Sequence, residues 1–325
     1  MLATFKKRWK LFGESIEKAE PGIYSDKTKL WFYIKFLFLR ATKGVYMIDF
    51  IQYKFYERNR FGRKRFVEYQ SLHWIMEKCN DVKSDELFDS KKLFNERFEK
   101  FLGRPWLSIK DSTYEEFVAF LKENDEIFVK PEVGSFGDGI EILRYQENHD
   151  YHDKYEKLVR SESIAEGLVK QAKEFSEFNE SSLNTMRIVT LIDKNGQSNI
   201  MVALVRLGRK GKVADNFHHY GIAAKIDIET GVVNTTGVDR EFARYTVHPD
   251  SNKVIPGFKI PKWDEIKARV IELSKQVPQT RYVGWDISLD ENYNIICIEG
   301  NRGADPDVTQ VTDQVGKYFD YKNRI

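Results

Sequence analysis

Apolar residues recur along the chain with two different spacings, which predict two kinds of element. Apolar positions three and four residues apart are typical of amphipathic helices, and β-branched runs bounded by turn signals are typical of strands. The helical segments are residues 87–101, 112–123 and 262–276. The strands and strand pairs are residues 126–143, 184–192, 199–207 and 282–301. Because helices and hairpin-connected strands are mixed, we predict a largely antiparallel α+β fold.

The most apolar window, residues 30–51, lies near the N-terminus. Lys35, Arg40 and Lys43 interrupt it, so it lacks the ~18 uncharged residues that a membrane-spanning helix needs. Two interpretations remain: a helix buried in a core, which is favoured, or an amphipathic helix at a membrane surface. Residues 46–80 continue with helix-like spacing, so we expect a mainly helical N-terminal region.

Composition and charge narrow the class of protein. Hydrophobic residues make up 41% and charged residues 31%, as in ordinary soluble globular proteins. Cys79 and Cys297 are too few for a disulfide framework or a cysteine zinc site, and no secretory signal is visible, so we expect a cytoplasmic location. Residues 1–70 carry 16 Lys and Arg against 7 Asp and Glu, whereas the remainder carries 36 against 43. The basic part could lie at the inner membrane face or on an anionic glycan, although solvated helix faces explain such charge more often.

The strand pair at residues 282–301 carries oxygen-bearing side chains near its open end. Glu299 and Asn301 alternate along one strand and so share a face. Asp286 on the preceding strand lies on the same face if the loop holds an even number of residues, because opposed residues point the same way. Two carboxylates and an amide oxygen suit a hard cation such as Mg²⁺. The alternative is a solvated hairpin end with scattered acids.

A glycine-rich stretch follows the strand that contains Lys130. It is neither a Walker loop nor a Rossmann fingerprint, because the residue order differs and Gly139 leads into a strand. The remaining interpretation is a β-turn-β flap whose backbone N–H groups cover phosphates, with Lys130 adding a positive charge. A glycine-rich hairpin without a ligand is the alternative, but Lys130 and the acidic hairpin favour a nucleotide site.

Four segments follow one another in the order found in a known family: FVKPEVGSFGDGI, SSLNTMRIVTL, VADNFHHYGIAAKIDIETG, and VGWDISLD with IICIEGN. Over about residues 45–315 the chain resembles the ATP-grasp superfamily, and within it the sugar-transfer-associated ATP-grasp family found with bacterial surface-polysaccharide genes. The resemblance implies that two α+β subdomains clasp ATP. The chain then divides into a basic, mainly helical region at residues 1–85 and an ATP-grasp domain at 86–325, with a lid over about 108–165.

The resemblance also implies individual roles. The ATP-contacting lysines would be Lys91, with Lys92 as an alternative, and Lys130. The phosphate flap would comprise Gly134, Ser135, Phe136, Gly137 and Gly139, and the adenine-reading hinge Glu166, Gly167 and Leu168. The family usually has two acidic residues at the hinge, so this chain departs from it at Gly167. Asp286, Glu299 and Asn301 would hold Mg²⁺, and two ions are typical of the superfamily.

Arg187 resembles the arginine that faces the γ-phosphate and the developing acyl phosphate. It lies in an otherwise apolar strand, which favours a functional role over a surface ion pair. Arg187 and Lys130 are therefore the expected catalytic residues. The residues expected to contact the acceptor substrates are Asn184, Asp215, Asn216, His218, His219 and Arg302. The two histidines depart from the family pattern; they could assist proton removal from an amine or have no such role.

These features predict an ATP-dependent carboxylate–amine ligase that forms an acyl phosphate and then an amide. By resemblance, the carboxylate is a sugar acid of a bacterial surface polysaccharide and the acceptor is a small amine, with no nucleic-acid partner. One alternative is an ATP-grasp phosphotransferase that acts on a hydroxyl group. The other is a nucleotide- or glycan-binding protein without turnover, which the combination of Lys130, Arg187 and the three oxygen ligands argues against.

Overall fold

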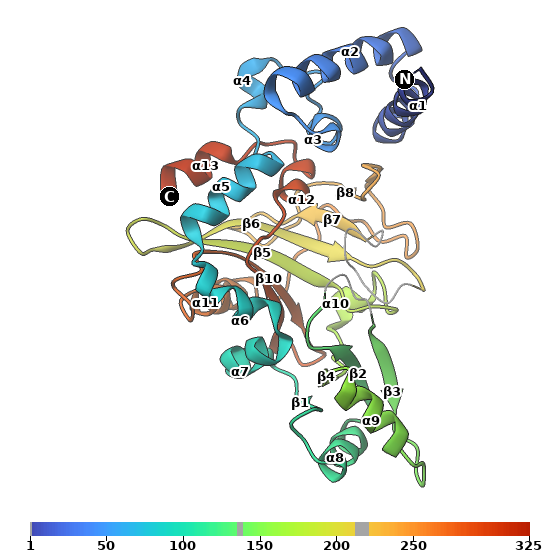
Figure 1. The fold of residues 1–325 in the computed structure, drawn as a ribbon, viewed down its shortest axis with the longest axis vertical. Helices are drawn as coiled ribbons and strands as arrows, with labels where there is room; N and C mark the ends of the chain where they lie inside the picture. The colour runs from blue at the N-terminus through green and yellow to red at the C-terminus, as the bar shows by residue number, and fades with distance from the viewer. Residues whose placement is uncertain (1, 135–138, 212–220) are drawn as a thin grey trace.

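The computed structural model describes residues 2–134, 139–211 and 221–325, with only the backbone described for residues 2–5. Three parts are stacked along the longest axis of the molecule (Figure 1). N-terminal helices lie at one end, a large sheet crosses the middle, and a smaller sheet with two helices lies at the other end. The paired strands of both sheets are antiparallel, which confirms the predicted α+β class.

The N-terminal third is helical, as expected. Its helices are α1 (Leu2–Ala19), α2 (Asp26–Lys43), α3 (Met47–Gln52), α4 (Arg60–Arg63), α5 (Tyr69–Cys79), the 3-10 helix η1 (Val82–Ser84), α6 (Asp85–Asp89) and α7 (Lys91–Leu102). The hydroxyl group of Ser25 accepts from the Thr28 N–H at the start of α2, and Gly44 ends that helix in the left-handed conformation. The apolar window of residues 30–51 is therefore divided between α2 and α3.

One face of α2 is buried in an aromatic core. Phe32 and Phe36 pack there with Phe12 of α1 and Phe50 of α3, and the cluster extends to the large sheet. This confirms the core-helix interpretation for that face. None of the helices in the described ranges is long and apolar enough to cross a bilayer.

The smaller sheet has the strand order β1-β4-β2-β3. Its strands are β1 (Trp106–Ser108), β2 (Glu126–Pro131), β3 (Glu141–Arg144) and β4 (Ser163–Gly167). Its helices are α8 (Tyr114–Asn124) and α9 (His152–Arg160). Thr113 and Glu116 form a capping box that starts α8, and Phe117 anchors the helix in the apolar core of this unit. The unit occupies nearly the same residues as the predicted lid.

The large sheet has the order β11-β10-β5-β6-β7-β8-β9. Its strands are β5 (Thr185–Ile192), β6 (Ser198–Leu207), β7 (Ile222–Lys225), β8 (Gly237–Val238), β9 (Arg244–Tyr245), β10 (Tyr282–Leu289) and β11 (Ile295–Asn301). The remaining helices are α10 (Lys173–Ser176), α11 (Trp263–Ser274), α12 (Pro306–Val311) and α13 (Tyr318–Arg324). Side chains alternate along β5, so the two faces of the sheet pack in different apolar cores. Ile188 packs in the core that contains residues of α7 and α11, and Leu191 packs in the core that contains residues of α5 and α13. Helix α5 therefore packs with the large sheet.

A bulge sets the register of the acidic hairpin formed by β10 and β11. The connection, residues 290–294, holds an odd number of residues. If the pairing next to the turn continued regularly, Asp286 would lie opposite Ile298. That register would turn Glu299 to the opposite face. The register instead shifts by one residue beyond Ile287, and Asp286 lies opposite Glu299. The bulge thus gives the facing of Asp286 and Glu299 that was predicted to need an even-numbered loop.

Candidate active site

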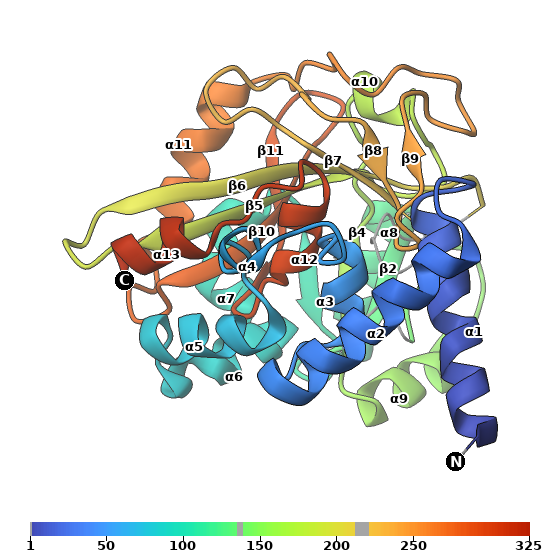
Figure 2. The same ribbon diagram turned by 90° about the horizontal axis from the view of Figure 1, so that it is seen from above.

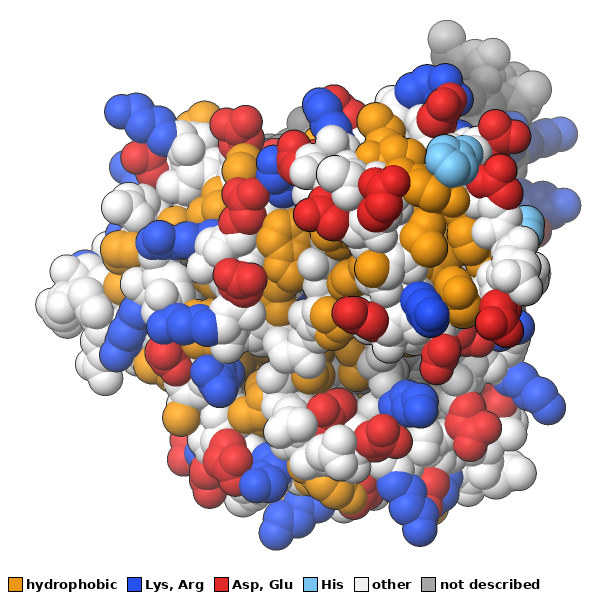
Figure 3. Space-filling model, turned by 90° about the horizontal axis from the view of Figure 1, so that it is seen from below, with side chains coloured by type: hydrophobic (Ala, Val, Ile, Leu, Met, Phe, Trp, Pro, Cys, Tyr) orange, Lys and Arg blue, Asp and Glu red, His pale blue; other side chains and the backbone are white. Residues whose placement is uncertain are grey.

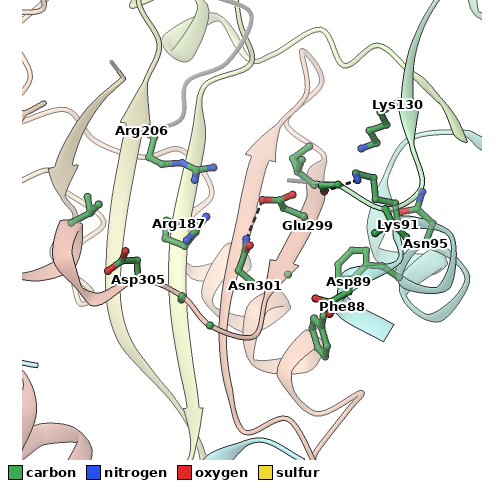
Figure 4. Close-up of a pocket in the computed structure, with 18 of the residues that line it drawn as sticks. Phe88, Asp89, Lys91, Asn95, Lys130, Arg187, Arg206, Glu299, Asn301 and Asp305 are labelled. Atoms are coloured by element: carbon green, nitrogen blue, oxygen red, sulfur yellow. Dashed lines mark hydrogen bonds between the residues drawn. The ribbon is translucent and has the colours of Figure 1, made fainter. Parts of the chain in front are cut away.

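Strand register gathers charged side chains on one face of the large sheet. Glu299 lies opposite Asp286, and Asp286 lies opposite Arg187 on the other neighbouring strand. Thr185, two residues before Arg187, lies opposite Arg206. Opposed residues and alternate residues point the same way, so four charged side chains from four adjacent strands share this face. Figure 4 shows Glu299, Arg187 and Arg206 side by side along it.

A pocket of about 580 Å³ lies between this face and the smaller sheet, a volume typical of small-molecule sites. Helix α7 and the segment after β11 complete its walls. Its charged and polar lining residues are Asp89, Lys91, Asn95, Lys130, Glu166, Arg187, Arg206, Glu299, Asn301, Asp305 and Thr309. The sequence-predicted residues that line it are Lys91, Lys130, Gly134, Glu166, Arg187, Glu299 and Asn301.

Asp286 forms ion pairs with two arginines. Nε of Arg187 lies 2.5 Å from Oδ1, and a terminal nitrogen of Arg206 lies 2.8 Å from Oδ2. Asp286 is only 2% exposed, and burial alone would raise its pKa, but the two guanidinium groups outweigh burial and hold the pKa well below its usual range. The carboxylate is therefore ionised, and it fixes both arginines on the wall of the pocket.

Glu299 and Asn301 form the part of the oxygen cluster that opens into the pocket. The Asn301 amide donates to Oε1 of Glu299 over 3.0 Å (Figure 4). Loss of solvent raises the pKa of Glu299, and the negative charge of Asp286 raises it further. A bound cation would relieve this repulsion, so the carboxylate and amide oxygens fit Mg²⁺. Within the described ranges, no group of three or more His, Cys, Asp or Glu is arranged to hold a metal ion.

Lys130 reaches into the pocket from β2 and is 2.8 Å from Oε2 of Glu166 on β4. Arg104 forms a bidentate pair with the same carboxylate, with nitrogen–oxygen distances of 3.0 Å, and Asn95 donates to it as well. Burial would raise the pKa of Glu166, but Arg104 and Lys130 hold it well below its usual range. The Glu166 side chain therefore holds Lys130 in place.

The structure separates the two candidate lysines at the start of α7. The amino group of Lys91 lies in the pocket and donates to the carbonyl oxygen of Gly134 over 3.0 Å (Figure 4). Burial and the neighbouring Lys130 lower its pKa. Lys92 points elsewhere, with its amino group 2.5 Å from Asp111. Of these two lysines, Lys91 is therefore the one placed to contact a ligand in this pocket.

The expected flap and hinge are described only in part. Gly134 lines the pocket, Gly139 packs against Pro131, and Ser135, Phe136 and Gly137 lie outside the described residues. At the hinge, the Gly167 N–H already donates to the carbonyl oxygen of Pro105 over 3.0 Å. Neither Gly167 nor Leu168 is among the lining residues.

Two of the residues expected to contact the acceptor have structural partners instead. Asn184 is fully buried, and its amide nitrogen donates to Gln171 and to two backbone carbonyl groups, so it braces the start of β5 outside the pocket. Arg302 pairs with Asp85 at 3.0 Å and with Asp89 at 3.1 Å, so it ties the end of β11 to α6. The other expected residues, Asp215, Asn216, His218 and His219, lie outside the described residues.

Arg206 and Arg104 were not predicted from the sequence. Arg206 is the single charge in the apolar run from Ile200 to Leu207, the same signal that identified Arg187. Arg104 follows Gly103 in a short connection that carries no recognisable pattern. Its importance depends on Glu166, which is distant in the sequence. Cys297 is fully buried, and burial raises the pKa of its thiol to about 12.

Comparisons with known proteins found similar solved structures. The ATP-grasp ligase PsnB, in complex with a minimal precursor, Mg and ADP, aligns with a TM-score of 0.46 and 14% identity over 76% of this chain and 62% of that one. The D-alanine-D-alanine ligase from Coxiella burnetii aligns with a TM-score of 0.42 and 12% identity over 71% and 54%. This chain therefore spans about half to two thirds of the length of these structures.

No curated protein matches the sequence. The family model described as "Sugar-transfer associated ATP-grasp" matches residues 74–318, about three quarters of the chain. The two sheets that face each other across one pocket are those of the ATP-grasp fold. The chain belongs to the sugar-transfer-associated ATP-grasp family.

Proposed function

We propose that this protein is an ATP-dependent carboxylate–amine ligase. The observation that carries the proposal is the placement of two cationic pairs across one pocket. Lys91 and Lys130 enter from the side of α7 and the smaller sheet, and Arg187 and Arg206 line the large sheet. Phosphoryl transfer depends on positioning and on neutralising charge, and this arrangement supplies both for a triphosphate and a carboxylate.

In the proposed reaction, a substrate carboxylate oxygen attacks the γ-phosphorus of ATP, the bond to ADP breaks, and an acyl phosphate forms. The nitrogen of an amine then attacks the acyl carbon, loses a proton, and expels inorganic phosphate to leave an amide. Lys91 and Lys130 bind the phosphates of the nucleotide, whereas Arg187 and Arg206 orient the carboxylate and stabilise the charge on the transferred group. A closed lid would keep water away from the acyl phosphate.

We infer that Glu299 and Asn301 hold Mg²⁺ from the open side of the pocket, with Asp286 behind them. Both oxygens of Asp286 already accept from guanidinium groups, so this carboxylate serves first to place the arginines. When bound, Mg²⁺ supplies charge neutralisation on the phosphates of the nucleotide. Both arginines line the pocket, where they would contact the substrate carboxylate while Asp286 holds them in place.

The substrate class is proposed from the family. The matching family is associated with sugar transfer, so we propose a sugar acid of a bacterial surface polysaccharide as the carboxylate and a small amine as the acceptor. A cytoplasmic location, where ATP and activated sugars are available, fits this chemistry.

The test is release of phosphate from Mg-ATP by the purified protein. Panels of sugar acids and amines are supplied together and separately, and the product is identified by mass spectrometry. We expect phosphate release that requires both substrates and a product with the mass of the amide. An Arg187→Met variant should lose this activity.

Two outcomes would replace the proposal. Phosphate transfer to a hydroxyl group without an amine would identify a phosphotransferase. Nucleotide binding without turnover in any combination would identify a binding protein. A Lys92→Met variant controls for loss of charge at α7, because Lys92 lies outside the pocket.

A further inference from the structure

The outward face of α2 is apolar, although the opposite face of the same helix is already buried in a core. The outward residues recur at helical spacing and are each between 40% and 65% exposed: Leu30, Trp31, Ile34, Leu37 and Phe38. A surface helix normally carries polar residues opposite its buried face. A contiguous set of large apolar side chains in solvent therefore marks a contact surface.

Basic side chains surround these five residues, which we call the α2 outer face. Lys27, Arg40 and Lys43 lie on the same helix and are exposed, and in the described parts of the chain none of the three forms an ion pair. Two acids lie close by: Glu17 pairs with Lys29, and Asp26 is exposed at the start of α2, so the basic residues outnumber the acids there. Positive charge around exposed aromatic residues is the composition of a helix that lies on an anionic bilayer.

The neighbouring segment extends the surface. Lys35 of α2 donates to the backbone carbonyl groups of Tyr56 over 2.6 Å and Arg58 over 3.3 Å, which places the segment before α4 beside α2. Helix α4 presents Phe61, which is 78% exposed, together with the exposed Arg60 and Lys64. Helix α4 therefore also exposes aromatic and basic side chains.

The position of this surface suits a peripheral attachment. Helix α2 lies at the end of the molecule farthest from the smaller sheet (Figure 1), and the view from above looks onto it (Figure 2). The opposite end mixes Lys and Arg with Asp and Glu across its surface (Figure 3). Contact through α2 would leave the smaller sheet free to move over the pocket.

We propose that the α2 outer face, with its surrounding basic side chains, binds the surface of a bilayer that contains anionic lipids. The lipid interface accounts for both features, because apolar side chains enter the acyl boundary while Lys and Arg contact phosphate head groups. A soluble polyanion would account for the charges but not for Trp31 and Phe38. A second copy of the chain would account for the apolar residues but not for the excess of positive charge.

The test is sedimentation of the full-length protein with vesicles of phosphatidylcholine that contain about one third phosphatidylglycerol. We expect wild-type protein to sediment with these vesicles and to dissociate as salt rises from about 0.1 M to about 1 M, because screening shortens the reach of the charges. A Trp31→Ser/Phe38→Ser variant should bind roughly tenfold or more weakly, since two large apolar side chains no longer leave water. Lys27→Gln/Lys43→Gln should weaken binding to these anionic vesicles and leave any binding to vesicles of phosphatidylcholine alone unchanged.

Matched controls replace exposed apolar residues elsewhere. Val254→Ser and Phe319→Ser change side chains that are 59% and 46% exposed but lie outside the α2 outer face, and they should bind like wild type. A second readout uses Ile34→Cys labelled with an environment-sensitive fluorophore. Both native cysteines are buried, so the new thiol is labelled selectively, and its emission should shift to the blue with vesicles, unlike that of Val254→Cys.

The proposal is overturned if wild-type protein does not bind these vesicles, or if the Trp31→Ser/Phe38→Ser variant binds them as tightly. It is also overturned if these substitutions instead abolish a concentration-dependent dimer, or if the protein binds a soluble polyanionic polysaccharide but no vesicle. Vesicle binding requires no turnover, so these outcomes are independent of the proposed ligase activity.

Discussion

At the scale of single residues, the site depends on which of two chemically equivalent neighbours faces the pocket. Lys91 and Lys92 are adjacent in the sequence, yet only Lys91 reaches the carbonyl oxygen of Gly134. The amino group of Lys91 also lies near that of Lys130, and the mutual repulsion contributes to its lowered pKa. A polyanionic ligand between the two ammonium groups would remove this repulsion, as in a phosphate site.

The first prediction compares these two lysines. Lys91→Met should weaken ATP binding roughly 10- to 100-fold, because a charge-assisted hydrogen bond to phosphate is lost. Lys92→Met removes the same charge from the same helix turn and should change ATP affinity less than about twofold. Isothermal titration calorimetry with a non-hydrolysable ATP analogue measures both affinities. Equal losses in the two variants would contradict the assignment of Lys91.

A second residue-scale prediction concerns Glu68, which is partly buried beside Asp49. Burial and then the charge of Asp49 raise the pKa of Glu68 to about 7. A carboxyl group whose folded pKa is raised favours the folded state when protonated, so stability falls as pH rises from about 4, the unfolded value, to about 7. Glu68→Gln should therefore raise the free energy of unfolding by about 1–2 kcal/mol at pH 8 and change it little at pH 4.

Urea unfolding at the two pH values measures this effect. Glu123→Gln, on the exposed side of α8, serves as the control and should leave the difference between the two pH values unchanged. A Glu68→Gln variant that is destabilised at pH 8 would show that the charge of Glu68 has a favourable partner in the folded protein.

At the scale of elements, a β-bulge positions the oxygen donors. Regular pairing after the turn would place Asp286 opposite Ile298, with Glu299 and Asn301 directed away from the arginines. One additional residue in β11 turns both side chains into the pocket. Bulges often redirect side chains next to active sites in this way.

The third prediction tests the register that the bulge sets. Exchanging the two side chains, Ile298→Glu/Glu299→Ile, moves the carboxylate from the position opposite Asp286 to the bulged position. Mg²⁺-dependent ATP affinity should fall at least tenfold or so, because the carboxylate is displaced. Circular dichroism checks that the variant is folded, and Ile298→Val, which keeps Glu299 in place, should bind within about twofold of wild type. A folded exchange variant with unchanged affinity would show that the register does not position the ligands.

At the scale of the whole molecule, Arg104 connects the two sheets that border the pocket. It pairs with Glu166 on β4 and donates to the carbonyl oxygens of Cys297 and Ile298 on β11. Both partners of the ion pair are less than a tenth exposed. Removing one partner of such a buried pair leaves an uncompensated charge, and this costs more than the pair itself contributes.

The fourth prediction tests this connection. Arg104→Leu should lower the free energy of unfolding by about 3–5 kcal/mol. Hydrogen exchange should rise in β2 and β4, because the smaller sheet loses a connection to the large one. Arg144→Leu breaks a surface pair with Glu126 and should cost at most about 1 kcal/mol. Equal free energies of unfolding in the two variants would show that the pair of Arg104 with Glu166 stabilises the protein no more than a surface ion pair does.

The sequence by itself determined the class of fold and identified most of the charged residues that line the pocket. Helical and strand periodicities are local, so α8, α11, β5 and β6 begin and end close to the predicted residues. The predicted oxygen donors and Arg187 also came from local patterns. Burial of a charge in an apolar strand is costly, and the arginine of such a strand therefore usually has a partner or a function.

Only the tertiary structure decided which of these residues meet. The bulge in β11, the pairing of Asp286 with a second arginine, and the contact of Arg104 with Glu166 all depend on residues that are distant in the sequence. Their geometry follows from strand register and packing, which balance many weak interactions across the whole chain. Local periodicity therefore predicts that a residue lies on a face of an element, but the assembled sheets decide what that face contacts.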